Sequence, residues 1–195
     1  MKITVAGTGY VGLVAGACFA EKGHDVLCVD IDENKVNAMK KGICPIYEEK
    51  LEDLMIKNYK AGRLDYTTDY KTAYKDADVI FIGVGTPKKK DGSADLSYVK
   101  NVACQIAENA EKNCLVVVKS TVPVGTNDKI EALIKENLAH DVKIEVASNP
   151  EFLAQGHAVR DTFSAKRIVI GTESQEAENL LQEIYKHFNL HIVSV

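Results

Sequence analysis

The chain has 195 residues, of which 46% are hydrophobic and 27% charged, and its formal net charge at pH 7 is −4. This length and hydrophobic content are enough to bury a sizeable core. Mild acidity with both signs mixed gives no reason to expect nucleic acid or an anionic membrane as a partner. No apolar run approaches the roughly 20 residues of a spanning helix, and the chain begins with a strand-like segment instead of a signal peptide. We therefore expect a cytoplasmic protein.

The cysteines and histidines predict neither a disulfide framework nor a metal site. The five cysteines form no Cys-x-x-Cys pair, and an odd number in such a chain favours reduced, buried thiols. His187 and His191 have the helical spacing of metal ligands, but Asn189 between them indicates that the helix ends there.

The first thirty residues predict a complete strand-helix-strand unit that binds a dinucleotide. An apolar strand over 2–6 leads into a Gly-x-Gly-x-x-Gly turn over 7–12, and apolar residues then recur at helical spacing as far as Phe19. A second apolar strand over 26–29 ends in Asp30. The acid lies at the end of a strand and at the distance from the glycine turn that this kind of unit requires.

Each glycine of the turn has a separate physical reason. Gly7 permits the sharp turn, Gly9 lets a pyrophosphate approach the backbone, and Gly12 lets helix and strand pack closely. The free N–H groups and the positive dipole end of the helix then face the phosphates. Asp30 is suited to accept hydrogen bonds from a ribose and to repel a 2′-phosphate, so the sequence favours NAD over NADP. Lys35, a short way downstream, softens this preference.

The remaining segments alternate between strands and helices without a break in composition. This alternation predicts an α/β fold over residues 1–195, a Rossmann-like, doubly wound, mainly parallel sheet of about eight strands with helices on both faces. The expected strands are 2–6, 26–29, 64–68, 79–82, 114–118, 143–147, 168–170 and 191–195. The expected helices lie around 11–19, 33–41, 51–55, 99–107, 130–138 and 177–188.

Polar side chains follow several of the apolar strands. Because ligands of doubly wound sheets lie outside the carboxyl ends of the strands, we expect these side chains to converge with the glycine turn on one crevice. The triplet 88–90 of lysines indicates a solvated turn, with a lid over the crevice as the alternative. The polar residues concerned are Asp30, Thr86, Ser120, Thr121, Asn149 and Glu151.

A crevice that holds NAD, two threonines and a carboxylate suits an oxidoreductase that positions a hydroxylated substrate for hydride transfer. Glu151 is a candidate general base, or a group that holds a water directly or through Thr121. The alternative for Glu151 is a strand-end carboxylate that caps a helix.

The chain resembles the N-terminal part of the UDP-glucose/GDP-mannose dehydrogenase family, and among its members the UDP-glucose 6-dehydrogenases. The resemblance spans nearly the whole chain, and its last two motifs are the most specific. The motifs are Val5-Ala-Gly-Thr-Gly-Tyr-Val-Gly12, Pro45-Ile-Tyr-Glu48, Val84-Gly-Thr-Pro87, Asp91-Gly-Ser-Ala-Asp-Leu-Ser-Tyr98, Lys119-Ser-Thr-Val-Pro-Val-Gly125 and Asn149-Pro-Glu-Phe-Leu153.

The resemblance implies a two-step oxidation of the primary alcohol of a UDP-sugar substrate to a carboxylate, with two NAD molecules. In the family, an alcohol dehydrogenase step is followed by formation of a thioester on a cysteine and by its hydrolysis. UDP-N-acetylmannosamine and GDP-mannose are alternative substrates. A dehydrogenase of simple hydroxy acids and a stand-alone, non-catalytic dinucleotide-binding module are alternative functions.

Carried over by motif, the resemblance implies a role for individual residues. Thr86 and Thr121 would line the nicotinamide end of NAD, and Glu151 would assist thioester hydrolysis while Thr121 places the water. Many members have a glutamate at the position of Gln155, where an amide can still form a hydrogen bond. The residues expected to hold the adenosine and pyrophosphate are Gly7, Gly9, Tyr10, Val11, Gly12, Asp30 and Lys35. The segment expected to touch the sugar nucleotide comprises Glu151, Phe152, Leu153 and Gln155.

The family's catalytic cysteine lies in a Gly-Gly-x-Cys-x-x-Lys-Asp motif, preceded by a lysine and an asparagine on a long central helix, and these 195 residues contain none of this. None of the five cysteines has that sequence setting. We therefore expect the chain to be the NAD-binding domain of a longer dehydrogenase, or a gene fragment, that binds NAD without turnover. Family dimers form largely through the central helix, so we expect a monomer or weak dimer here and a homodimer for the longer parent.

Overall fold

The computed structural model describes all 195 residues, and every segment predicted to be a strand forms one. The predicted strand ends are correct to within one residue. The strands are β1 (Lys2–Ala6), β2 (Asp25–Val29), β3 (Leu64–Thr67), β4 (Val79–Ile82), β5 (Cys114–Val118), β6 (Ile144–Ser148), β7 (Ile168–Ile170) and β8 (Ile192–Ser194). The helices are α1 (Tyr10–Glu21), α2 (Glu33–Lys40), α3 (Leu51–Lys60), α4 (Tyr70–Lys75), α5 (Ser97–Asn109), α6 (Thr126–Asn137), α7 (Ala158–Phe163) and α8 (Gln175–Tyr185), the last followed by a 3-10 turn over Lys186–Phe188.

The main sheet has six parallel strands in the order β3-β2-β1-β4-β5-β6. Val5 of β1 lies opposite Cys28 of β2 on one side and Phe81 of β4 on the other. The strand order therefore reverses between β1 and β4, which is the switch point at which doubly wound sheets bind dinucleotides. The Rossmann-like, mainly parallel class expected from the sequence is confirmed.

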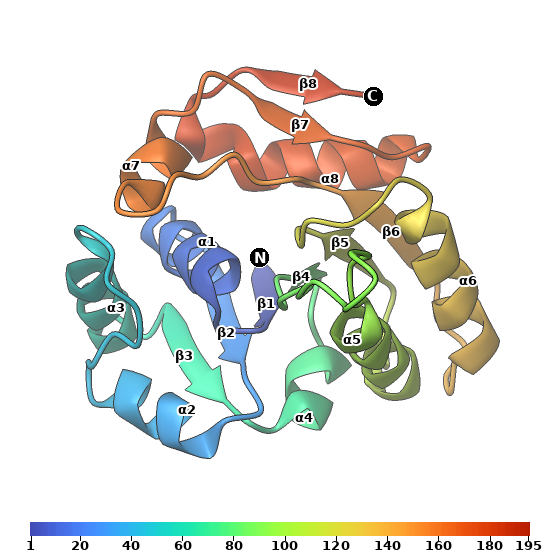
Figure 1. Ribbon diagram of the computed structural model, residues 1–195, viewed down its shortest axis with the longest axis horizontal. Helices are drawn as coiled ribbons and strands as arrows, with labels where there is room; N and C mark the ends of the chain where they lie inside the picture. The colour runs from blue at the N-terminus through green and yellow to red at the C-terminus, as the bar shows by residue number, and fades with distance from the viewer.

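The expectation of about eight strands in one sheet needs a correction, because β7 and β8 form a separate parallel pair. This pair meets the main sheet at one antiparallel bridge, in which Ser148 and Gly171 exchange both backbone hydrogen bonds at 2.8 and 2.9 Å. An apolar run indicates that a strand is buried, but it does not say which strand is its partner. In Figure 1 the pair lies beyond α8, at the top of the view.

Helices cover both faces of the main sheet (Figure 1). The physical cause is the alternation of side chains along strands that are apolar throughout. In β4, Val79 and Phe81 join the core cluster shared with α1, α2, α3, α7 and α8, whereas Ile80 and Ile82 join the cluster shared with α4, α5 and α6. All four side chains are fully buried. No helix combines the length and apolarity needed to cross a lipid bilayer.

The sequence did not predict α4 and α7, which have six residues each. A helix of this length completes fewer than two turns, so its apolar residues cannot show a helical repeat. The start of α4 is nevertheless set by its sequence, since the Asp69 carboxylate accepts hydrogen bonds from the backbone N–H and the hydroxyl of Thr72.

All five cysteines are free thiols; Cys18, Cys28 and Cys114 are buried, as predicted, whereas Cys44 and Cys104 are only half-buried. Burial raises the pKa of each of the three buried thiols to about 12. Because the thiolate is the reactive form, these thiols are inert near neutral pH.

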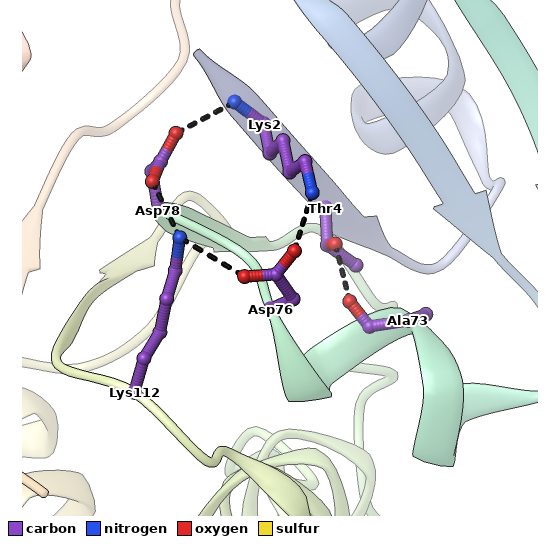
Figure 2. Close-up of polar contacts among 6 residues, drawn as sticks. All are labelled: Lys2, Thr4, Ala73, Asp76, Asp78 and Lys112. Carbon is purple, nitrogen blue, oxygen red and sulfur yellow. Dashed lines mark hydrogen bonds and ion pairs between the residues drawn. The ribbon is translucent and has the colours of Figure 1, made fainter.

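At the amino edge of the sheet, four charged residues connect β1, β4 and the start of β5 (Figure 2). The Lys2 N–H and the Lys112 ammonium both donate to the Asp78 carboxylate, each at 2.7 Å, while Asp76 pairs with both lysine side chains. Burial opposes ionisation of Asp78, but the hydrogen bonds from Lys112 and Lys2 outweigh it and lower its pKa. The network therefore favours the folded chain only while Asp78 is ionised.

Replacement of Asp78 tests this network. The folded-state pKa of Asp78 lies below its unfolded value, so its contribution is complete above the unfolded pKa and is lost as the pH falls through the folded one. We expect Asp78→Asn to lower the free energy of unfolding at pH 7 by about 1 kcal/mol, a value discounted for the partial exposure of the group. The difference from wild type should shrink as the pH falls from about 5 to about 2. Urea unfolding across this range measures it, with the exposed Asp141→Asn as control; equal effects of both substitutions would contradict the prediction.

Candidate functional site

The glycine turn lies at the switch point between β1 and β4. Gly7 has a φ of +94°, a conformation that favours glycine, and its N–H donates to the carbonyl of Val29 at 2.8 Å. A Cβ atom on Gly12 would lie 2.0 Å from the Gly7 carbonyl oxygen, whereas a Cβ on Gly9 would meet nothing within 4 Å. Gly12 therefore serves the packing of α1 against the turn, and Gly9 leaves the space in front of the turn open.

A pocket of about 310 Å³ opens in front of this turn, between the ends of β1, β2 and β4 and the helices α4 and α5. Its lining includes Gly9, Asp30 and the exposed side chain of Ile31. No side chain caps the N-terminus of α1, and its first turn has no acidic residue, so its free N–H groups are open to an anion. A pocket with an open glycine, free N–H groups and a carboxylate fits a dinucleotide.

Asp30 is held as an ionised acceptor at the end of β2. Its Oδ2 accepts hydrogen bonds from the Thr8 N–H at 3.1 Å, from the Thr8 hydroxyl and from the Lys35 ammonium at 3.0 Å. Its Oδ1 accepts from the Asp32 N–H at 3.1 Å. Burial opposes ionisation, but the hydrogen bonds of Thr8 and Lys35 outweigh it and lower the pKa of Asp30. Sequence reasoning missed Thr8, which is fully buried and orients the carboxylate.

Three predicted residues from three strand ends come together at the carboxyl edge of the sheet. The Thr86 hydroxyl donates to the Thr121 carbonyl at 2.8 Å, and the Thr121 hydroxyl donates to Glu151 Oε1 at 3.3 Å. Glu151 Oε2 accepts from the N–H of Leu153 at 3.0 Å. The next helix begins at Ala158, so the Glu151 carboxylate orders the loop and does not cap a helix.

A polar frame of the half-buried Lys119 and the buried Asn149 and Tyr185 lies next to Thr121 and Glu151. The Lys119 ammonium donates to the Asn149 side-chain oxygen at 2.9 Å, and the Asn149 amide donates to a carbonyl of β7 at 2.8 Å. The Tyr185 hydroxyl donates to the same Asn149 oxygen. Burial lowers the pKa of Lys119 to about 8, although the nearby charge of Glu151 opposes this shift. Lys119 and Asn149 each stand two residues before a site residue, so their bond sets how close Thr121 and Glu151 approach.

Along the segment after Glu151, side chains alternate between solvent and the protein core. Phe152 is 59% exposed, with the Arg167 guanidinium 5.8 Å from its ring centre, whereas Leu153 packs against the larger core cluster. Gln155 is exposed and forms no hydrogen bond within the chain. Its side-chain amide is thus free to bind a ligand. Val11, in the first turn of α1, is partly exposed.

Tyr10 lies beside the glycine turn, but its hydroxyl points away from the pocket. It donates to Glu48 Oε2 and accepts from the Gly156 N–H at 2.9 Å. Any contact of Tyr10 with a pyrophosphate therefore falls to its backbone N–H. Glu48 belongs to a motif that the sequence analysis recognised without assigning it a role, and the structure shows it buried and hydrogen-bonded to Tyr10 and Gly156.

Comparison with known proteins agrees with this geometry. The profile described as "UDP-glucose/GDP-mannose dehydrogenase family, NAD binding domain" matches residues 1–189. The chain is 53% identical over 192 residues to UDP-glucose 6-dehydrogenase YwqF of Bacillus subtilis and 51% identical over 195 residues to a UDP-glucose 6-dehydrogenase of Rhizobium meliloti. Each match covers 98% of this chain but 44% of the relative, so the chain spans less than half the length of these curated relatives.

Solved structures give the same result. A UDP-glucose dehydrogenase from Pyrobaculum islandicum has a TM-score of 0.96 and 38% identity, and a GDP-mannose dehydrogenase from Pseudomonas aeruginosa has a TM-score of 0.93 and 38% identity. Both matches cover 100% of this chain and 46% of the other. The chain therefore belongs to the UDP-glucose/GDP-mannose dehydrogenase family, in which it corresponds to the NAD binding domain.

Proposed function

We propose that these 195 residues are the NAD-binding domain of a UDP-glucose 6-dehydrogenase, an enzyme that oxidises the C6 alcohol of UDP-glucose to the carboxylate of UDP-glucuronate with two NAD molecules. The observation that carries the proposal is that the dinucleotide pocket and the group of Thr86, Thr121 and Glu151 occupy the same edge of one sheet. UDP-glucose is favoured as substrate because the relatives at 53% and 51% identity are UDP-glucose 6-dehydrogenases.

The pocket is suited to hold NAD by three contacts. The free N–H groups of α1 and the open backbone at Gly9 would hold the pyrophosphate, and the carboxylate of Asp30 would accept hydrogen bonds from the adenosine ribose. The negative charge of Asp30 disfavours a 2′-phosphate, although Lys35, 3.0 Å from it, neutralises part of this charge. When bound, NAD supplies the acceptor of the hydride, and the protein orients and polarises the reactants.

Glu151 is the candidate general base for hydrolysis of an acyl intermediate. The Thr121 hydroxyl donates to its Oε1 at 3.3 Å, so one water can form hydrogen bonds to both side chains from the open side of the pair, and the Glu151 carboxylate can accept a proton from it. The Thr86 hydroxyl fixes the backbone of Thr121 at 2.8 Å and thereby the position of this pair. The backbone from Phe152 to Gln155 continues from Glu151 and would contact the sugar nucleotide.

These residues alone lack a nucleophile for a thioester. None of the five cysteines has the Gly-Gly-x-Cys-x-x-Lys-Asp setting, and burial keeps Cys18, Cys28 and Cys114 protonated. The 195 residues are therefore proposed to bind NAD without turning over a sugar nucleotide.

Calorimetry with Asp30→Ala tests the ribose contact. Loss of a charged acceptor for the ribose hydroxyls should weaken NAD binding by about tenfold to a hundredfold. Glu33→Ala is the matched control, since Glu33 is exposed, lies three residues away and forms no hydrogen bond through its side chain. Unchanged affinity of Asp30→Ala, or an equal loss in Glu33→Ala, would exclude the ribose role.

A methyl group on Gly9 tests where the pyrophosphate lies. The space around Gly9 is open, so Gly9→Ala should keep the melting temperature of the wild type while the added methyl weakens NAD binding by at least about tenfold. Gly12→Ala should instead lower the melting temperature, because its Cβ would lie 2.0 Å from a backbone oxygen. Thermal unfolding gives the melting temperature of each variant, and calorimetry gives its affinity for NAD. Full NAD affinity in a folded Gly9→Ala protein would place the pyrophosphate elsewhere.

An assay of NADH production tests the absence of turnover. With UDP-glucose and NAD, the 195 residues should form no NADH above a blank without enzyme, while UDP-glucose 6-dehydrogenase YwqF of Bacillus subtilis serves as the positive control. NADH formation that depends on UDP-glucose would show that these residues contain a complete active site. UDP-N-acetylmannosamine and GDP-mannose, run in parallel, detect turnover of a different sugar nucleotide.

A further inference from the structure

Three segments that lie far apart in the sequence meet at one buried carboxylate. Glu48, in the turn before α3, is 7% exposed. Its Oε2 accepts hydrogen bonds from the Tyr10 hydroxyl of α1 and from the Gly156 N–H, at 2.9 Å, in the loop between β6 and α7. The Tyr10 hydroxyl also accepts from this N–H at 2.9 Å. The cluster thus connects the cofactor turn to the loop that begins with Glu151.

The cluster is not arranged for greatest stability. Oε1 of Glu48 is buried and has no hydrogen-bond partner, and an unpaired buried polar atom costs free energy. Burial and the hydrogen bond to Glu48 raise the pKa of Tyr10 to about 12, so its hydroxyl remains a donor at neutral pH. A carboxylate kept buried with one oxygen unpaired is better explained by what it positions than by what it stabilises.

The backbone on both sides of the cluster is fixed. The Leu51 N–H donates to the Glu48 carbonyl at 3.2 Å, and Lys50 between them adopts the left-handed φ of +66° that starts α3. Tyr10 is the first residue of α1 and packs against the larger core cluster. The third partner, Gly156, lies in a loop and has a φ of +86°. Two rigid elements therefore hold one loop amide.

We propose that Tyr10 and Glu48 are positioning residues that couple occupancy of the cofactor turn to the conformation of the loop over residues 151–156. An anion bound at the N-terminus of α1 orders the first turn of that helix, which carries Tyr10. The Tyr10 hydroxyl, through its hydrogen bond with the Gly156 N–H, then orders the loop. The ordered loop fixes Glu151, whose Oε2 accepts a hydrogen bond from the Leu153 N–H. The importance of the loop rests on the proposed function, while the coupling itself is a property of these contacts.

Amide hydrogen exchange at Gly156, measured by NMR with and without NAD, tests the coupling. In the wild type, NAD should slow exchange of the Gly156 amide by about tenfold, because the ordered hydrogen bond opens less often. In Tyr10→Phe and in Glu48→Gln, the same amide should exchange faster and NAD should no longer slow it. Binding of NAD should remain in Glu48→Gln, since Glu48 does not line the dinucleotide pocket.

Matched controls separate positioning from general loss of stability. Tyr47→Phe and Glu49→Gln change exposed neighbours of the cluster and should keep the wild-type response of Gly156 to NAD. Amides of β4 and β5 report global stability, and their exchange should be the same in Tyr10→Phe as in the wild type. A merely structural role would instead accelerate exchange in these strands together with Gly156.

Three results would overturn the inference. NAD that binds the wild type without slowing Gly156 exchange, or a full NAD response in Tyr10→Phe, would leave the proposed function intact but exclude the coupling. Faster exchange throughout β4 and β5 in both variants would make the cluster a stabilising contact only. Failure of NAD to bind the wild-type chain would remove the proposed function together with the coupling.

Discussion

The close approach of three backbone segments at the switch point is the constraint on which the site depends. A Cβ atom on Gly12 would lie 2.0 Å from the Gly7 carbonyl oxygen, and one on Gly83 would lie 2.9 Å from the Gly12 Cα. Only residues without a Cβ allow the backbone of α1 to pack this closely against the ends of β1 and β4. The same approach turns the uncapped N-terminus of α1 toward the pocket and brings Thr8 to the carboxylate of Asp30. The two features proposed to hold NAD, the open helix N-terminus and the oriented carboxylate, thus share one steric cause.

Polar contacts at the two edges of the sheet differ in kind. At the amino edge, Asp78 and its lysine partners are partly exposed, so their contribution is modest and depends on pH. At the carboxyl edge, Lys119 and Asn149 lie next to Thr121 and Glu151 in a frame that also includes Tyr185. A largely buried frame loses more when one partner is removed, because the other remains desolvated and unpaired. The frame at the carboxyl edge therefore suits a functional site, whose atoms must stay at fixed distances from one another.

Tyr10 illustrates how far a motif predicts the role of its residues. Its position in the glycine turn suggests a contact with the cofactor, yet its hydroxyl is bound by Glu48 and by the Gly156 N–H. Glu48 comes from a third motif, and its burial brings together the cofactor turn and the loop after Glu151. Each of the three motifs is recognisable in the sequence, but their meeting depends on how α1, α3 and α7 pack.

The sequence by itself determined the eight strands, the glycine turn and the acid after β2, because side-chain periodicity and glycine conformation are local properties of the chain. It also placed Thr86, Thr121 and Glu151 at strand ends, and a parallel sheet necessarily gathers such ends at one edge. Only the tertiary structure decided that β7 and β8 leave the main sheet, since strand partners are chosen by packing between distant segments. The short helices α4 and α7 were also seen only in the structure, because six residues cannot show a helical repeat. The tertiary structure alone decided the frame next to the site and the direction of Tyr10, because both depend on contacts between residues far apart in the sequence.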